Sequence, residues 1–244
     1  MNAIAILCKT PNKEFLDFYA SLKNNNYDVY IFIDDNNYQI LNSQGLNFIQ
    51  IDTADSIQNG FHLFSGLITD CGAWDKAIYY FSTFNTAYNF VWFIEDDVFI
   101  PNKDIIRLID EKYLEEDVLC QDHTRNLDGD EGMQGWMWWV HITKEVMPPP
   151  WGKSMMCASR LSSKLLKTVK NFISDNKNAN KFIEYFFVTL ASQNNLRVKP
   201  IPELKKIVYS HPWNSDDLSH TELIHPIKDL SLHTGYRKLL AEKY

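Results

Sequence analysis

Apolar and polar positions along the first hundred residues predict strands and helices in turn. Short apolar runs of β-branched and aromatic residues indicate buried strands, whereas apolar residues three or four positions apart indicate a helical face. We expect strands at Ala3–Cys8, Asp28–Ile33 and Asn47–Ile51, and helices at Lys13–Lys23 and Trp74–Tyr88. The stretch Ile57–Cys71 is poorly patterned, and we expect a loop with some helix there. This alternation predicts an α/β fold with a largely parallel sheet and right-handed crossovers.

The second half of the chain has a less regular pattern. Helices are expected at Asp104–Leu114, Ser159–Ser174 and Phe182–Gln193, and strands at Asp117–Cys120, Trp136–Ile142 and Arg197–Ile201. No internal repeat or low-complexity linker divides the chain, so residues 1–244 are expected to form a single domain.

The most informative segment is Val91–Pro101, in which an apolar strand ends in three consecutive carboxylates, Glu95, Asp96 and Asp97. The bulky β-formers before them are typical of a central strand that is covered on both faces. Charged groups at the end of a buried strand need compensation, because burying them alone is costly. A divalent metal supplies it, and α/β proteins bind ligands at the carboxyl ends of strands. The alternative is a solvated turn with helix-capping acids, a role that Asp104 illustrates.

Composition narrows the classes of function. The 244 residues are 45% hydrophobic, which is ample for one core, and the net charge is −7 with a pI near 5.5. This balance argues against a nucleic-acid partner, and only the Lys-rich run from Arg160 to Lys170 offers a local basic groove. The four cysteines have no CxxC spacing and indicate reduced, partly buried thiols.

The N-terminal sequence predicts a first strand rather than a signal peptide, and no apolar run approaches the length of a membrane span. We therefore expect a cytoplasmic protein without a transmembrane segment. Association with a membrane through a partner or a substrate stays open, as does the oligomeric state.

Three segments, in their order along the chain, resemble the GT-A glycosyltransferases. EDDVF at Glu95–Phe99 has the form and position of the DxD element of that superfamily. Trp151–Leu166 is similar to its acceptor-side segment, in which a glycine-containing turn precedes a serine-capped helix. Phe182–Pro202 is similar to its acid-bearing helix and following strand. The resemblance covers most of residues 3–228 and rests on order and spacing more than on exact residues.

The resemblance implies a GT-A fold, Rossmann-like and mostly parallel, with residues 1–105 as the nucleotide-sugar-binding half. Residues 106–244 would form the less regular acceptor-binding and catalytic half. The implied activity is metal-dependent transfer of a sugar from a nucleotide-diphosphate sugar, by default a UDP-sugar, to a glycan or other hydroxyl acceptor, with inversion. The alternatives are a retaining transferase of this fold and, from another class, a non-catalytic carbohydrate-binding or scaffold protein on a degenerate transferase fold.

Carried over by position, the resemblance implies how the donor and its metal are held. Asp97 would ligate the metal directly, while Glu95 would contact the metal, its bound water or the ribose. Asp96 belongs to the same motif and would face the donor. His225 would complete the metal shell, and Lys228 would meet the diphosphate. An imidazole ligand favours Mn²⁺ over Mg²⁺.

Four further residues would lie near the nucleotide in the same comparison. Asp34 and Asp35 end the second expected strand, where the family holds the nucleoside, and Thr10 closes the first. Lys76 opens a helix that faces the same crevice and could neutralise a phosphate. The alternatives are ordinary turn chemistry for the acids and a solvated helix charge for the lysine.

Glu184 is the candidate for the catalytic base. Inverting transfer needs a carboxylate that removes the proton of the acceptor hydroxyl. Glu184 is the only carboxylate in the apolar run around it, which favours a pKa raised by desolvation. The alternative is a helix N-terminal acid stabilised by the macrodipole. Asp130 and Glu131, in a glycine-flanked loop, are the reserve candidates.

Tryptophans offer the ring faces on which sugars stack, so Trp136, Trp138 and Trp213 are candidates for binding the acceptor. In the expected strand, Trp136 and Trp138 share one face and Trp139 takes the other. Core packing is the alternative for each. His211, close to Trp213, is a second choice as a metal ligand.

Overall fold

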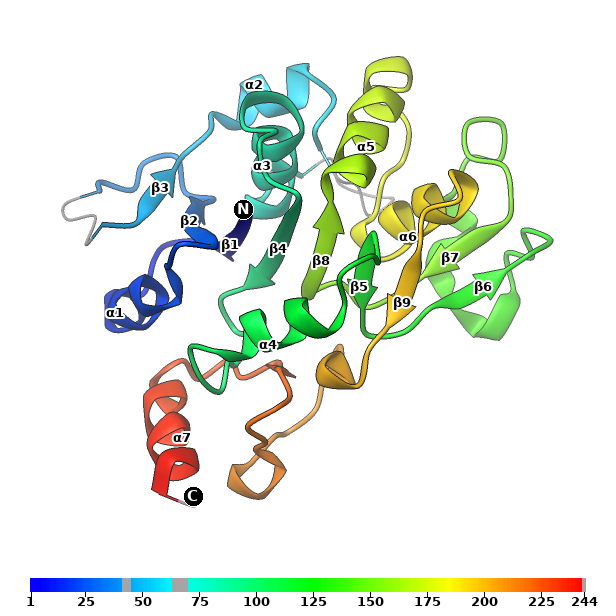
Figure 1. The fold of residues 1–244 in the computed structure, drawn as a ribbon. Helices are drawn as coiled ribbons and strands as arrows, with labels where there is room; N and C mark the ends of the chain where they lie inside the picture. The colour runs from blue at the N-terminus through cyan, green and yellow to red at the C-terminus, as the bar shows by residue number, and fades with distance from the viewer. Residues whose placement is uncertain (41–44, 63–69, 243–244) are drawn as a thin grey trace.

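The computed structural model describes residues 1–40, 45–62 and 70–242. Its centre is a seven-stranded sheet of order β3-β2-β1-β4-β8-β5-β9 (Figure 1). These strands are β1 Asn2–Cys8, β2 Tyr27–Ile33, β3 Asn47–Ile49, β4 Phe90–Glu95, β5 Val118–Cys120, β8 Ala158–Ser162 and β9 Val198–Pro200. The helices are α1 Lys13–Leu22, α2 Thr53–Gln58, α3 Ala73–Tyr79, α4 Ile105–Lys112, α5 Ser163–Asp175, α6 Ile183–Gln193 and α7 Ser231–Glu242. Two short pairs lie outside the sheet, antiparallel β6 Thr124–Asn126 with β7 Trp151–Lys153 and parallel β10 Lys206–Ile207 with β11 Ile224–His225.

The central sheet is mostly parallel. β1 pairs in parallel with both β2 and β4, and β2 pairs in parallel with β3. β8 is antiparallel to both β4 and β5, and β5 is parallel to β9. The predicted α/β class, with a mostly parallel sheet flanked by helices, is therefore confirmed.

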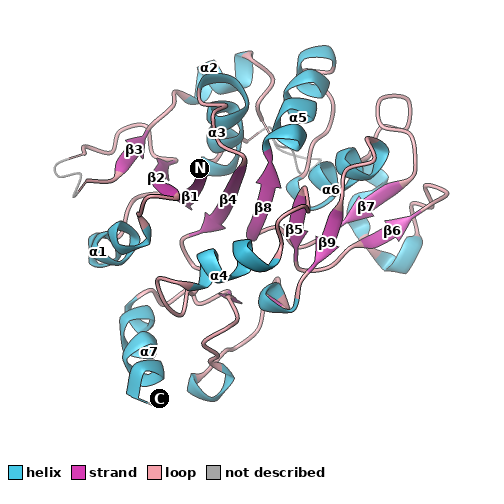
Figure 2. Cartoon of the chain, viewed as in Figure 1, coloured by secondary structure: helices cyan, strands magenta, loops and turns pink. Residues whose placement is uncertain are grey.

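The side chains of β4 alternate between two hydrophobic clusters, one on each face of the sheet. Val91 and Phe93 pack with residues of α3, α5 and α6, whereas Trp92 and Ile94 pack with residues of α1 and α4. Figure 2 shows these helices against the strands that they cover. Burial on both faces explains why the sequence of this strand is an unbroken apolar run.

The carboxyl ends of β1, β2 and β4 meet at one edge of the sheet. The amide of Asp34 donates to the carbonyl of Cys8 (2.9 Å), and the amide of Asp96 donates to the carbonyl of Leu7 (3.0 Å). The chain returns to this edge late in the sequence, where the amide of Ile227 donates to the carbonyl of Asp97, just after β4 (2.8 Å). Residues that are far apart in the sequence are thereby held around one acidic turn.

The segment Trp136–Ile142 is not the strand that the sequence predicts. Met137–His141 forms a 3-10 helix instead. The run is apolar at nearly every position, so it has no period that could separate a strand from a helix. Trp139 is buried, and its indole donates to the carbonyl of Met133 (3.1 Å).

The helix predicted at Ser159–Ser174 begins later than expected, because its first residues belong to β8. α5 starts after Ser162, whose hydroxyl accepts a hydrogen bond from the amide of Leu165 (3.2 Å) and caps the helix. Arg160 can lie in a buried strand because its guanidinium donates to the carboxylate of Asp110 (2.8 Å). A strand with a charged residue at its centre is hard to predict from the sequence, because the ion pair that permits its burial is not visible there.

The helix predicted at Trp74–Tyr88 is shorter than expected. α3 continues into a π-helical turn at Tyr80–Phe84 and ends there. Of the poorly patterned stretch Ile57–Cys71, residues 63–69 lie outside the described part of the chain.

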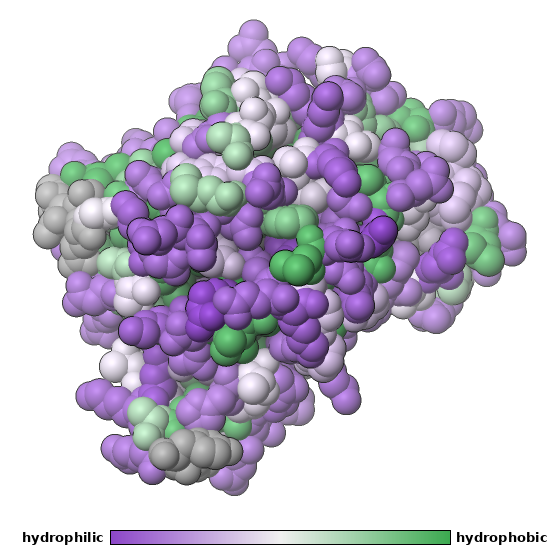
Figure 3. Space-filling view, viewed as in Figure 1, coloured by the Kyte–Doolittle hydropathy of each residue, from purple (hydrophilic) through white to green (hydrophobic). Residues whose placement is uncertain are grey.

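The face of the molecule in Figure 3 is largely hydrophilic, with apolar residues in small separate spots. Within the described ranges, no helix is long and apolar enough to cross a membrane. All four cysteines are free and buried, as the sequence predicts.

Candidate active site

The acidic turn after β4 lies at the centre of the candidate site. β4 ends at Glu95, and Asp96 and Asp97 form a turn in which the amide of Val98 donates to the carbonyl of Glu95 (3.0 Å). The indole nitrogen of Trp74 donates to Glu95 Oε1 (2.8 Å) and so fixes the orientation of this carboxylate.

His225 faces two of these carboxylates from β11. Its Nε2 lies 3.2 Å from Asp97 Oδ1 and 3.7 Å from Glu95 Oε2. Its Nδ1 lies 2.7 Å from the carbonyl oxygen of Val208, which can only accept, so Nδ1 carries a proton. In the neutral imidazole, Nε2 is then a lone-pair donor directed at two carboxylates. A proton or a metal cation between them makes this arrangement favourable.

Burial and mutual repulsion shift the ionisation of the acids. Burial, followed by the charge of Asp97, raises the pKa of Asp96 to about 6. Burial also raises the pKa of Glu95, against the opposing hydrogen bond from Trp74. Burial disfavours a charged His225, but the nearby carboxylate of Asp97 outweighs burial and raises the pKa of the imidazole. The site therefore concentrates negative charge that a cation would compensate.

The residues present fit a divalent cation. Asp97 Oδ1 is buried and accepts no hydrogen bond from the residues that the structure describes, although His225 Nε2 lies 3.2 Å away. Ligand atoms of Glu95, Cys157 and His225 lie within 4.8 Å of one another. The backbone carbonyl on His225 Nδ1 is the kind of outer contact that orients a metal-binding imidazole. The structure thus brings together the three predicted metal ligands, Asp97, Glu95 and His225.

Cys157 is a site residue that the sequence did not indicate. The amide of Glu95 donates to the carbonyl of Cys157 (2.9 Å), since Cys157 immediately precedes β8 and β8 runs antiparallel to β4. Burial, followed by the nearby charge of Glu95, raises the pKa of this thiol well above its usual range. No spacing signal could have found this contact, because the strand that creates it was not predicted.

A cavity of about 260 Å³ opens beside the acidic turn. Its lining comes from the carboxyl ends of three strands and the start of α3: Leu7, Cys8, Lys9, Asp34, Gly72, Ala73, Trp74, Glu95, Asp96 and Asp97. Asp34 therefore shares a cavity with the three acids. Thr10 is exposed just beyond β1, and the carboxylate of Asp35 accepts from the amide of Asn37 (2.8 Å). Neither of these two lines the cavity.

Lys76 is buried and directed at the end of β2. Its ammonium donates to the carbonyl of Asp34 (2.6 Å) and to Asn36 Oδ1 (2.9 Å), and it lies 3.4 Å from Asp34 Oδ1. These contacts use the three N–H donors of a lysine. They favour a role in positioning Asp34 over the predicted contact with a phosphate.

Glu184 lies in the first turn of α6, and its carbonyl accepts from the amide of Ser154 (2.8 Å). Burial raises the pKa of its carboxyl to about 7; the charge of Lys153 lowers it, and the charges of Asp122 and Glu95 raise it further. Its carboxylate accepts no hydrogen bond from the part of the chain described. A carboxylate with these properties is poised for proton transfer near neutral pH.

Trp136 and Glu184 share a neighbour, Lys153, whose charge lowers the pKa of Glu184. Trp136 makes an edge contact with the ring of Tyr185, which follows Glu184 on α6 (6.5 Å between centres). The ammonium of Lys153 lies 5.1 Å from the centre of the Trp136 ring. Trp138 packs instead on the residue that precedes α6, with 4.8 Å between ring centres.

The remaining candidates lie near the site or outside it. Trp213 donates its indole N–H to the carbonyl of His225 (2.9 Å) and so positions β11. His211 is exposed and packs on Trp213, with 4.0 Å between ring centres. Lys228 is exposed three residues after His225. The reserve acids serve their own loop: Asp130 accepts from the amide of Gly132 (2.9 Å), and Glu131 pairs with Lys144 (3.0 Å).

Fold and site together define an α/β protein with an acidic cavity at the carboxyl edge of its sheet. No family model matches the chain, and no curated protein matches its sequence. Among solved structures, an active-site variant of LgtC is similar over 99% of this chain and 96% of its own, with 8% identity and a TM-score of 0.48.

Two further structures are similar to the chain. One is the galactosyltransferase LgtC in complex with donor and acceptor sugar analogs, with 10% identity, a TM-score of 0.42, and 81% of this chain and 73% of that one covered. The other is mouse xyloside xylosyltransferase 1 in its apo form, with 10% identity, a TM-score of 0.41, and 82% and 85% covered. Likeness at this level of identity and TM-score does not bear on the activity of this chain.

Proposed function

We propose that this chain is a metal-dependent glycosyltransferase that moves a sugar from a nucleotide-diphosphate sugar to a hydroxyl acceptor with inversion. One observation carries the proposal: Asp97, Glu95 and His225 form a cation-compatible cluster, and Glu184, whose pKa is raised to about 7, is near enough for the charge of Glu95 to contribute to that shift. The cation site would neutralise the leaving diphosphate, and Glu184 would accept the proton of the acceptor hydroxyl.

The donor would lie in the cavity beside the acidic turn. Asp97, Glu95 and His225 would hold the cation, which when bound would neutralise the charge of the leaving diphosphate. Asp34, held by Lys76, would accept hydrogen bonds from the nucleoside. The imidazole favours Mn²⁺, and a UDP-sugar is the first donor to test. Other predicted donor contacts, Thr10, Asp35 and Lys228, would be confined to the exposed rim.

The acceptor would lie on the side of α6. Glu184 would take the proton of the acceptor hydroxyl as that oxygen attacks the sugar carbon from the face opposite the diphosphate. The half-buried ring of Trp136 would offer a stacking face beside it, and Lys153 would hydrogen-bond the acceptor. Inversion follows from a single displacement in which one carboxylate serves as the base.

The proposal is tested with a panel of nucleotide sugars, assayed for hydrolysis and transfer with and without Mn²⁺. Asp97→Asn should lower the rate by at least about 100-fold and abolish Mn²⁺ binding in calorimetry, because it removes a charged ligand. Asp17→Asn, which removes an exposed carboxylate on α1, is the matched control and should change neither.

Metal-independent turnover that survives Asp97→Asn would overturn the proposal. NMR of the product settles the stereochemistry, since a retained anomeric configuration would exclude Glu184 as the base of a single displacement. A protein that binds glycans but turns over no donor would be the non-catalytic alternative.

A further inference from the structure

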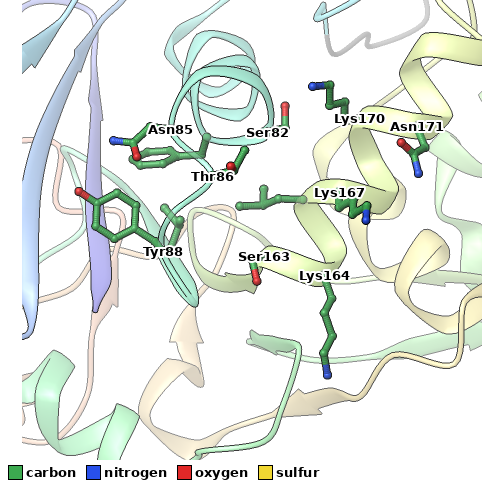
Figure 4. Close-up of a pocket in the computed structure, with 12 residues that line it drawn as sticks. Ser82, Asn85, Thr86, Tyr88, Ser163, Lys164, Lys167, Lys170 and Asn171 are labelled. Carbon is green, nitrogen blue, oxygen red and sulfur yellow. The ribbon is translucent and has the colours of Figure 1, made fainter.

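A second cavity lies at the opposite end of β4 from the acidic turn (Figure 4). It has a volume of about 520 Å³ and opens between α5 and the π-helical turn Tyr80–Phe84. Val91, at the start of β4, lines this cavity, and Glu95, at the end of the same strand, lines the other. At about 3.3 Å per residue, the two positions are roughly 13 Å apart. The two cavities share no lining residue.

Three lysines at the rim have no partner among the described residues. Lys164, Lys167 and Lys170 recur every three residues on α5 and all line the cavity. None of their ammonium groups has a hydrogen bond, an ion pair or a ring contact within the described ranges. No aspartate or glutamate is among the described residues that line the cavity. In a chain of net charge −7, this is a local concentration of positive charge that attracts an anion.

The floor of the cavity is apolar, and its rim can hydrogen-bond. Phe81, Val91 and Leu166 are buried side chains of the floor. Figure 4 shows Lys170 extending toward Ser82 on the facing turn. The volume is within the range of about 300–1,000 Å³ typical of small-molecule sites.

The lysines do not form a membrane-binding helix of the usual kind. The apolar face of α5, including Leu165, Val169 and Ile173, is buried in the core. An interfacial helix needs such a face free to enter the lipid. The combination of a concave apolar floor and free cations favours a single bound molecule instead.

We propose that this cavity binds a small anionic amphiphile, a phosphate or carboxylate carried on an apolar chain. The anionic group would lie at Lys170, which Figure 4 shows extending toward Ser82, and Lys167 would add positive charge at the same rim. The apolar chain would cover Phe81 and Leu166. The lysines belong to the run from Arg160 to Lys170, which the sequence offered as the only candidate for a basic groove. The assignment does not depend on the proposed transferase activity.

Calorimetry on the full chain tests the proposal, with decyl phosphate and decanoate below their micelle concentrations, inorganic phosphate, and anionic vesicles. Decyl phosphate or decanoate should bind one to one, at least tenfold more tightly than inorganic phosphate. The double variant Lys167→Gln, Lys170→Gln should weaken this binding about tenfold, or 1.4 kcal/mol. The variant Lys13→Gln, Lys238→Gln removes the same charge from exposed positions elsewhere and should leave it unchanged.

A second variant tests whether binding needs the cavity itself as well as the charge of the lysines. Asn171→Trp, at the exposed rim, should obstruct the mouth and reduce binding without altering the lysines. Equal affinity in wild type and the Lys167→Gln, Lys170→Gln variant would overturn the proposal. So would binding to anionic vesicles without binding to either monomeric amphiphile, or affinity for inorganic phosphate equal to that for decyl phosphate.

Discussion

At the residue scale, the proposed chemistry depends most directly on the ionisation of Glu184. Burial raises the pKa of its carboxyl to about 7, so the basic form predominates only above that pH. Transfer activity should therefore rise with pH through about 7. Glu184→Gln should lower the transfer rate about 10²- to 10⁴-fold and remove this rise, as steady-state rates between pH 5.5 and 9 would show.

A matched variant at an exposed glutamate and the dependence of thermal stability on pH are the controls for this prediction. Glu145→Gln, at an exposed position, should keep the wild-type profile, and Mn²⁺ binding should survive in both variants. A carboxyl with a raised folded-state pKa stabilises the fold below its unfolded pKa, and this stability is lost as pH rises through about 7. Glu184→Gln should thus gain thermal stability relative to wild type at pH 8 but not at pH 4. An unshifted profile in Glu184→Gln would assign the base elsewhere.

Sequence patterns bring Glu184 and Asp97 within reach of prediction, because each is an acid beside a strongly patterned apolar element. Trp74 and Cys157 contact Glu95 only through the tertiary arrangement of α3 and the segment before β8. A tryptophan or a cysteine alone does not indicate a ligand site, so these two contacts of Glu95 were found only from the structure. The direction of the Lys76 ammonium is likewise a packing result.

At the element scale, the buried pair of Arg160 and Asp110 ties β8 to α4. Arg160 donates to Asp110 (2.8 Å), which also accepts from the indole of Trp92 (3.0 Å) and the hydroxyl of Tyr27 (2.6 Å). Asp110→Ala should lower the free energy of unfolding by about 3–5 kcal/mol, because it leaves a buried guanidinium without its partner. Urea unfolding measures this loss.

A double variant tests the cause of that destabilisation. Asp110→Leu combined with Arg160→Met replaces both charges by apolar groups and should recover much of the lost stability. Asp104→Ala, which breaks an exposed pair with Arg107, should cost less than about 1 kcal/mol. A double variant as unstable as Asp110→Ala would show that the hydrogen bonds, rather than the stranded charge, dominate.

Two of the errors of element prediction have distinct physical causes. Trp136–Ile142 lacks a period, so neither strand nor helix has a distinguishing pattern there. β8 has a charge at its centre, which reads as a helix surface until the buried partner Asp110 is known. The other strands of the sheet were predictable because both of their faces are buried or their ends are marked by turns.

At the scale of the whole molecule, α7 packs on the returning chain that carries His225. His233 Nε2 lies 3.1 Å from the carbonyl oxygen of Ile227, and Leu240 packs in one cluster with Ile224. Arg237 in turn fixes α7 to the rest of the fold. The guanidinium of Arg237 donates to the carbonyl of Ile100 (2.9 Å) and lies 3.4 Å from the centre of the Phe18 ring. Arg237→Ala should lower the free energy of unfolding by about 2 kcal/mol. It should also weaken Mn²⁺ binding about tenfold, because the imidazole loses its support.

Two measurements decide this prediction, thermal unfolding and calorimetry with Mn²⁺. Lys238→Ala, the exposed neighbour on α7, is the control and should change neither. Loss of stability with full Mn²⁺ affinity would mean that β11 holds His225 without help from α7. The order of segments along the chain indicated that His225 could reach the acids. The support from α7 depends on tertiary packing, which no local sequence pattern encodes.

The crowding of carboxylates at the cavity mouth has a kinetic consequence for the proposed reaction. Glu95, Asp96 and Asp97 all line the cavity, so a diphosphate entering alone would meet like charges at close range. Substrate addition should then follow a compulsory order, with the cation before the donor. The apparent KM for the donor would fall as the cation concentration rises. Binding of the donor would then depend on prior binding of the cation at the acidic turn.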